Sequence, residues 1–575
     1  MRRSMIWVTL LLVACKGAPQ PRAQERQERP VQPVAAASEH AAHEAEPWTR
    51  EKLARGAVLL ADLGGVQRKV TTTSIEAQAL FNQGLALLYG FNHDEAARSF
   101  ARASELDPSC AACFWGLSYA LGPNYNVPML PERAALAWEA LGDAQRLAAT
   151  AGLATPLEQA LIAALGKRYK GPEYVAPAAM QELNVAYAEA MRGVARLFPH
   201  DDDVEVLFAE ALMNTNPWKL WSPDGTAAPG THDIVVTLEF VLMRNSTHVG
   251  ANHYYIHAME ASKTPEKALP SAERLAKLLP GAGHVVHMPA HIFQRVGRYA
   301  DASAANRRAI QVDEAYLKQV APPGYYPFYL AHNQGFLAYS AAMQGRAEES
   351  IAAARASAGT MPRDVVCGMP GMDFFVSEPL LALVRFGRWQ EILSEPAPEA
   401  KYPTLLALHH HARGMALAST GELAAARAEA EAIRKIAATL SDELITGLNQ
   451  GKQVLALAAK VVDARTAELA HEGNAVALWE EAVALEDTLA YNEPADWFYP
   501  TRHYLGAALL DMERAGEAEA VYRADLERHP NNGWALFGLS KALLAQKKSK
   551  EQKLAEQALA SAWRDADQQL TRSAL

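Results

Sequence analysis

Two short stretches of this sequence carry histidines at helical spacing. His253 and His257 stand four positions apart, and so do His287 and His291. Side chains at i and i+4 lie on the same face of an α-helix, so each pair would present two imidazoles together. Such a pair can offer two ligands to one Zn, Cu, Fe or Ni ion. Glu260 shares the face of the first pair and could act as a carboxylate ligand or as a base.

Two features of the sequence restrict what this histidine spacing can indicate. Neither pair has a glutamate directly after its first histidine, so the HExxH signature of metalloproteases is absent. Pro289 stands between His287 and His291, and proline fits best in the first turn of a helix. If a helix begins at Pro289, His287 precedes it and that pair loses its common face.

The histidines lie within a repeating pattern of small and aromatic residues. One unit starts at Ala77, another starts at Tyr499, and looser units begin near Val249, Gly283, Phe328 and Ala407. The shared spacing is carried in the first unit by Gly84, Ala96, Phe100, Ala103 and Pro108, and in the last by Gly506, Ala518, Tyr522 and Pro530. This pattern resembles the tetratricopeptide repeat (TPR), a helix-turn-helix unit of about 34 residues in which small residues let the two helices approach closely.

The TPR resemblance implies an all-α fold, a TPR-like solenoid wound as a right-handed superhelix. We expect it to run without a break from residue 48 to residue 575. The stretches 120–230 and 310–330 are rich in Pro, Gly and aromatic residues, and they predict long connections or irregular helix pairs.

The same resemblance places many histidines on one surface. In TPR proteins, certain positions of each first helix line a concave groove, and eight of the 18 histidines fall at these positions. They are His253, His257, His284, His287, His291, His332, His411 and His503. Peptide-binding TPR grooves that clamp carboxylates usually show Lys, Arg and Asn there, so an imidazole-lined groove departs from the family pattern.

The main prediction is a transition-metal site for Cu, Zn or Fe in this groove. Its ligands would come from His253, His257, His287 and His291, which lie on helices of adjacent units. Glu260 and His332 form the next tier, and His284, His411 and His503 are further groove candidates. The metal could serve catalysis, storage or sensing.

Two other hypotheses stay open. A scaffold could hold a protein or peptide partner in the groove without metal, as TPR arrays mostly do. Alternatively, groove histidines could act as acids and bases without metal.

Composition excludes several function classes. The formal net charge is −10 and the charges of both signs are mixed along the chain, so no basic stripe predicts nucleic-acid binding. The sequence shows no GxSxG elbow, no phosphate-binding glycine loop and no dinucleotide fingerprint.

The N-terminus predicts export. Residues 1–14 combine two arginines with an apolar run too short to span a bilayer, as in a signal peptide. The segment 12–15 resembles the lipobox of bacterial lipoproteins, which implies cleavage before Cys15 and lipidation of Cys15. Residues 15–47 predict a disordered tether after the anchor. Lys16 favours the outer membrane, so the expected location is the cell envelope, facing the periplasm.

The other cysteines offer two motifs. Cys110 and Cys113 form a CxxC pair that Phe114 follows, so haem attachment is excluded, and a disulfide, a thiol pair or two small packing residues remain. Cys367 lies near Met369 and Met372, which are soft ligands suited to Cu(I). A tight loop with apolar Met packing is the favoured interpretation there.

Overall fold

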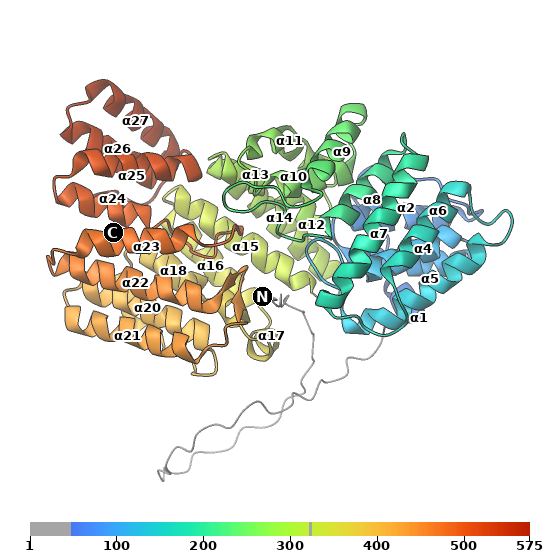
Figure 1. Ribbon diagram of the computed structural model, residues 1–575, viewed down its shortest axis with the longest axis horizontal. Coiled ribbons are helices and arrows are strands. Elements are labelled where there is room, and N and C mark those ends of the chain that lie inside the picture. Colours follow the sequence, from blue (N-terminus) through green and yellow to red (C-terminus); the bar gives the residue numbers. More distant parts are fainter. Residues whose placement is uncertain (1–47, 321–324) are drawn as a thin grey trace, which may run out of the picture.

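Pairs of antiparallel helices stack along the whole described chain. The computed structural model describes residues 48–320 and 325–575, so the predicted signal peptide, Cys15 and the tether lie outside the described residues. In Figure 1 the pairs nearest the N-terminus (blue to green) and those nearest the C-terminus (yellow to red) form two halves, with helix α15 between them. The fold is an all-α, TPR-like solenoid, as predicted.

The N-terminal part of the array contains nine α-helices and two short 3-10 helices within the described range. They are α1 (Arg50–Gly56), α2 (Ile75–Tyr89), α3 (His93–Leu106), α4 (Ala111–Leu121), η1 (Pro131–Arg133), α5 (Ala134–Ala148), α6 (Pro156–Leu165), η2 (Gly166–Arg168), α7 (Pro177–Leu197), α8 (Asp202–Met213) and α9 (Thr231–Arg244). The stretch 120–230 therefore contains further helices joined by long loops.

The middle part contains two of the predicted unit starts, Val249 and Gly283. Both are confirmed as the first residues of helices. Its elements are α10 (Val249–Met259), η3 (Pro265–Ala268), α11 (Leu269–Leu278), α12 (Gly283–His287), α13 (Pro289–Arg295), α14 (Tyr299–Gln319), α15 (Tyr326–Met343) and α16 (Ala347–Thr360).

The C-terminal part adds further helix pairs and a small hairpin. Its elements are α17 (Arg363–Gly368), η4 (Met372–Ser377), α18 (Glu378–Arg385), α19 (Trp389–Ser394), α20 (Pro403–Ser419), α21 (Leu423–Thr439), β1 (Ile445–Thr446), β2 (Asn449–Gln450), α22 (Gly451–Leu469), α23 (Ala475–Asp487), α24 (Arg502–Asp511), α25 (Ala515–Arg528), α26 (Gly533–Ala545) and α27 (Ser549–Ala562). The two strands pair antiparallel. Within the described ranges, no helix combines the length and the apolar character needed to cross a membrane.

The repeat glycines have the packing role that their spacing predicts. A Cβ atom added to Gly84 would lie 2.7 Å from the Phe100 ring, and one added to Gly116 would lie 2.5 Å from it. Near the C-terminus, Gly506 and Gly538 approach the ring of Tyr522 in the same way. One aromatic side chain thus fills the space between two close first helices, and a larger residue at these glycines would push them apart.

The turn after the first helix repeats as well. It is closed by a residue with positive φ, which is a glycine in four consecutive units: Gly297, Gly345, Gly387 and Gly421. The unit of α2 uses Phe91 at this point, with φ of 54°. His471, Glu513 and Lys547 take the same conformation after later first helices and are exposed, whereas Phe91 is fully buried. The left-handed conformation is unfavourable for a bulky residue.

The solenoid winds tightly enough to bring distant units into contact. Helix α10 packs against the end of α2, where a Cβ on Gly250 would lie 2.6 Å from the Tyr89 ring. Helix α26 meets α15, because Trp534 Nε1 donates to the carbonyl oxygen of Ala342 at 2.9 Å. The first of these contacts forms one side of the histidine site.

Candidate metal centre

Four helices supply the histidines of the site. His253 and His257 lie on α10, and Glu260 follows at its C-terminal cap. His284 and His287 lie on α12, His291 on α13 and His332 on α15. These helices are the first helices of three successive units, so the repeat itself sets their side-by-side order.

The proline between His287 and His291 does not separate them. Helix α12 ends at His287 and α13 begins at Pro289, but the linking residue Met288 keeps helical angles, with φ of −49° and ψ of −35°. The two Nε2 atoms lie 2.8 Å apart. The spacing therefore brings this pair together despite the break.

The six histidines form two groups of three. Cluster A comprises His253, His257 and His284; cluster B comprises His287, His291 and His332. Within each cluster, one ring nitrogen from every histidine lies within 4.8 Å of the others. The sequence expectation that the two helical pairs converge on one point needs correction, because each pair instead meets a third histidine from α12 or α15. Helix α12 supplies His284 to cluster A and His287 to cluster B, so the two clusters lie side by side.

The site is an enclosed interior, which differs from the expected open groove. Of the eight histidines assigned to the groove, seven are buried and only His332 is half-buried. Irregular segments cover them: the rings of Tyr125 and Trp218 have centroids 5.2 and 5.7 Å from that of His257. The sequence-predicted connection 120–230 thus folds over cluster A, whereas His332 of cluster B stays half-buried.

Hydrogen bonds fix the protons of two imidazoles in cluster A. The carbonyl oxygen of Tyr89 can only accept, so the 2.5 Å contact places a proton on Nδ1 of His253. Nδ1 of His257 lies 3.0 Å from Oε1 of Glu260. Burial by itself raises the pKa of Glu260, but His257 and His291 outweigh it and hold that pKa below its usual value. Glu260 is therefore an ionised acceptor, and Nε2 of both His253 and His257 carries a lone pair.

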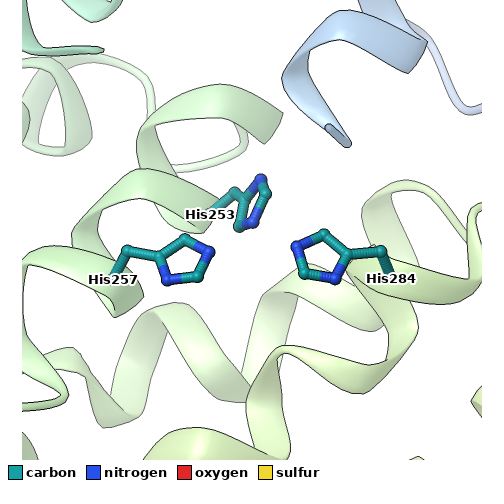
Figure 2. Close-up of side chains that lie close together, drawn as sticks. All are labelled: His253, His257 and His284. Atoms are coloured by element: carbon teal, nitrogen blue, oxygen red, sulfur yellow. The ribbon is translucent and has the colours of Figure 1, made fainter. Parts of the chain in front are cut away.

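These lone pairs have no donor. Nε2 of His253, Nε2 of His257 and both ring nitrogens of His284 are buried without a hydrogen-bond partner. Figure 2 shows the three rings turned toward one another. A buried unpaired polar atom costs roughly 1–3 kcal/mol, and a single N–H on His284 could meet only one of the two lone pairs.

Electrostatics keep cluster A in the state that binds metal. Burial lowers the pKa of His253, His257 and His284, and the neighbouring histidines lower the pKa of His253 and His284 further. The three imidazoles are therefore neutral at pH 7, which is the protonation state that coordinates a metal.

Cluster B gathers three Nε2 atoms. Asn306 uses its amide nitrogen to donate to the Ala302 carbonyl at 2.9 Å, so its Oδ1 accepts from Nδ1 of His287 at 2.6 Å. Nε2 of His287 then carries a lone pair, with Nε2 of His291 at 2.8 Å and Nε2 of His332 at 3.1 Å. Two nitrogens bound to one tetrahedral Zn stand about 3.3 Å apart, so these distances need only small adjustments to hold an ion.

A pair of glutamates lies behind the rings. Nδ1 of His291 is 2.7 Å from Oε2 of Glu260 and 2.8 Å from Oε2 of Glu493. Burial lowers the pKa of His291, but these carboxylates outweigh it and raise that pKa to about 10. His291 is therefore protonated at pH 7 in the metal-free protein, and a metal ion in cluster B would have to displace the proton on its Nε2. Glu260 contacts one histidine in each cluster, which is the common place of a carboxylate that orients a metal-bound imidazole.

Several parts of this arrangement were not predicted from the sequence. Glu493 reaches His291 across about 200 residues of chain. Phe91 packs its ring against cluster A, with centroids 4.7 Å from His253 and 5.6 Å from His257. No local pattern marks Tyr89 or Asn306, because their roles arise only when α2 and α14 pack against the site.

The two remaining groove histidines lie in other surroundings. His411 contacts the Ala458 carbonyl and the Tyr499 hydroxyl, and His503 bonds to Arg385 and Asp525. Neither joins a group of metal-ligand type among the described residues.

The cysteine motifs have separate outcomes. Cys110 and Cys113 are joined by a disulfide. The side chain of Cys367 lies outside what the structure describes.

Comparison with known proteins found only distant structural matches. No protein-family model matches the chain, and no curated protein matches its sequence. A solved structure of the human IFIT1 dimer with m7Gppp-AAAA is 13% identical with a TM-score of 0.32, covering 86% of this chain and 91% of that one. Yeast Tom70 is 12% identical with a TM-score of 0.28, covering 85% of this chain and 99% of its own. The APC/C hetero-tetramer Cut9–Hcn1 is 11% identical with a TM-score of 0.28, covering 85% of this chain and 88% of that one.

Proposed function

We propose that this protein binds two transition-metal ions, one in each histidine cluster. The observation that carries the proposal lies in cluster A, where Nε2 of His253 and Nε2 of His257 are buried without a hydrogen-bond partner and close to His284. A cation coordinated by the three nitrogens would satisfy them together.

The imidazole ligands restrict which metal ions the clusters can bind. Neutral imidazoles suit Zn, Cu, Fe and Ni, whereas Ca and Mg prefer oxygen ligands. Three protein ligands leave one position of a tetrahedral site open for water or a substrate, as in catalytic zinc sites. Because His332 is half-buried and borders a cavity, cluster B is the one whose open position water or a substrate could reach.

Elemental analysis of protein purified without a histidine tag tests the proposal. We expect two metal equivalents per chain. Combining His253→Gln with His284→Gln should remove one equivalent, and combining His287→Gln with His332→Gln should remove the other. His200→Ala, at an exposed histidine outside both clusters, should keep both. A chain that contains no metal and takes up no added Zn, Co or Cu would contradict the proposal.

A second candidate function is a scaffold for a protein partner. Helix α9 exposes Val236, Phe240 and Met243 at spacing i, i+4 and i+7, and Met243 is 78% exposed. Such an apolar stripe is typical of helix-docking surfaces. A photo-crosslinking residue at position 243 should trap one defined protein in cells, and the absence of a specific adduct would argue against this function.

We also propose that the chain is exported and lipid-anchored through Cys15. The Cys110–Cys113 disulfide supports an oxidising compartment. Replacing Cys15 with Ala should release the protein from membranes, and unchanged membrane association would contradict the anchor.

A further inference from the structure

A large cavity opens beside cluster B. Its volume is about 1010 Å³, and its wall includes His332 of cluster B and Glu493, which contacts His291. Pockets for organic ligands span roughly 300–1,000 Å³, so this space far exceeds what a metal ion and its water ligands need. The cavity is large enough for an organic molecule next to the proposed metal.

Carboxylates dominate the charge of the cavity wall. Among the described residues that line it, Lys219 is the only lysine or arginine. The acids of the wall are Glu378, Asp442, Glu443, Glu493 and Asp496. A wall of this composition attracts a cation and disfavours an anion.

The rest of the wall is largely apolar and aromatic. Aromatic faces pack against apolar bodies and also attract ammonium groups, with a strength that grows as water is excluded. The rings that line the cavity belong to Trp218, Phe328, Phe374, Phe375 and Phe498.

Two of the wall carboxylates have oxygens without a hydrogen-bond partner. Oε1 of Glu493 and Oε2 of Glu378 are buried without a hydrogen-bond partner, whereas Oε2 of Glu493 is paired with His291. The Glu493 residue is only 3% exposed. Burial raises the pKa of Glu378 to about 7. A ligand that brings N–H donors would satisfy these oxygens and favour their ionised form.

We infer that this cavity binds a small organic amine with an aromatic or apolar body, its ammonium group directed toward Glu378. That the ligand is an amine is inferred only from the residues that line the cavity. Only the placement of that amine beside a metal ion rests on the proposed function.

Three probes with one body and different charges test the inference. Equilibrium dialysis of the metal-free full chain would use 1-naphthylmethylamine, 1-naphthalenemethanol and 1-naphthaleneacetate, so that coordination to metal plays no part. We expect the amine to bind at least about tenfold more tightly than the alcohol, and the acetate to be excluded. Equal affinity for all three probes, or retention of none, would overturn the inference.

Variants separate the wall charges from general effects. Glu378→Gln should weaken amine binding about tenfold and leave alcohol binding within about twofold. Lys219→Met removes the competing cation at an exposed position, and it should tighten amine binding even if Glu378→Gln fails to fold. Glu422→Gln, at an exposed acid outside the cavity, is the matched control and should change nothing. Amine affinity that is unaffected by both wall variants would contradict the assignment.

Metal analysis on the same samples keeps the two proposals apart. A chain that retains the amine but binds no metal would contradict the proposed function and leave the ligand class standing. A chain that binds two metal ions but retains no amine would overturn the inference alone.

Discussion

Nδ1 of His253 donates to the backbone carbonyl of Tyr89, 164 residues earlier in the chain and 2.5 Å away. The bond exists because the solenoid brings α10 back against the end of α2. It leaves Nε2 of His253 as a fixed lone pair that faces His257 and His284. The winding of the repeats therefore determines the protonation pattern of the site.

Asn306 should affect the metal affinity of cluster B although it is not itself a metal ligand. Its Oδ1 accepts from Nδ1 of His287, so Asn306→Leu removes the acceptor and frees the imidazole to change tautomer. Partners of this kind change metal affinity about 10–100-fold, and we expect a loss of that size at cluster B only. Competition titrations with a chelator measure it. Asn306→Asp retains an acceptor and is the control; equal losses at both clusters, or none, would contradict this role.

Glu260 should affect both clusters. Its two oxygens contact His257 of cluster A and His291 of cluster B, whereas the glutamine of Glu260→Gln offers one acceptor oxygen and no charge. We expect metal affinity to fall about 10–100-fold in at least one cluster and to weaken in the other. The same chelator titrations detect this effect. If Glu260→Gln changed neither affinity, the carboxylate would have no part in orienting the rings.

Phe91 should stabilise cluster A through its ring rather than its backbone. Phe91→Gly relieves the left-handed backbone by about 1–2 kcal/mol but removes a fully buried ring, which costs about 3–5 kcal/mol. We expect a lower melting temperature and weaker metal binding at cluster A.

A matched variant at an open turn isolates the backbone contribution. Gly421 has φ of 93°, and an added Cβ would meet nothing within 4 Å. Gly421→Phe should destabilise the protein by about 1–2 kcal/mol and leave metal binding intact. Phe91→Gly that is as stable as the parent would refute the packing role.

The sequence predicted the helical repeat well because its signals are local. The glycines and aromatics of the first and last units pack as their spacing required, with Phe100 and Tyr522 each filling the space beside two glycines. The i, i+4 spacing also brought the histidine pairs together, even across Pro289.

The grouping of the histidines could not be read in the same way. Whether His257 meets His284 or His287 depends on the rotation and offset of α10 against α12, which no spacing along one helix records. The connections that cover the site are irregular, so their path depends on tertiary packing. Glu493 joins His291 only because the segment before α24 folds back onto the middle units.

His411 should make stability depend on pH outside the metal centre. Burial lowers its pKa to about 4, whereas an unfolded histidine titrates near 6.5. The unfolded state therefore binds more protons between these values, so stability falls as pH decreases from about 6.5 to 4. At pH 5 the loss attributable to His411 is about 2 kcal/mol. Urea unfolding of the metal-free protein at pH 7 and pH 5 measures the total change.

The variant His411→Gln isolates this contribution, since glutamine does not titrate. Its loss of stability between pH 7 and pH 5 should be smaller than that of the parent by about 2 kcal/mol, the contribution of His411. An identical pH dependence in parent and variant would show that His411 is not held neutral in the folded state.

Anomalous diffraction from crystals grown with Zn or Co would locate bound ions directly. We expect one peak in each cluster, about 2.0–2.1 Å from three imidazole nitrogens: His253, His257 and His284 in one, and His287, His291 and His332 in the other. Crystals that show no peak between these rings, or that place the metal only at surface residues, would contradict the proposal.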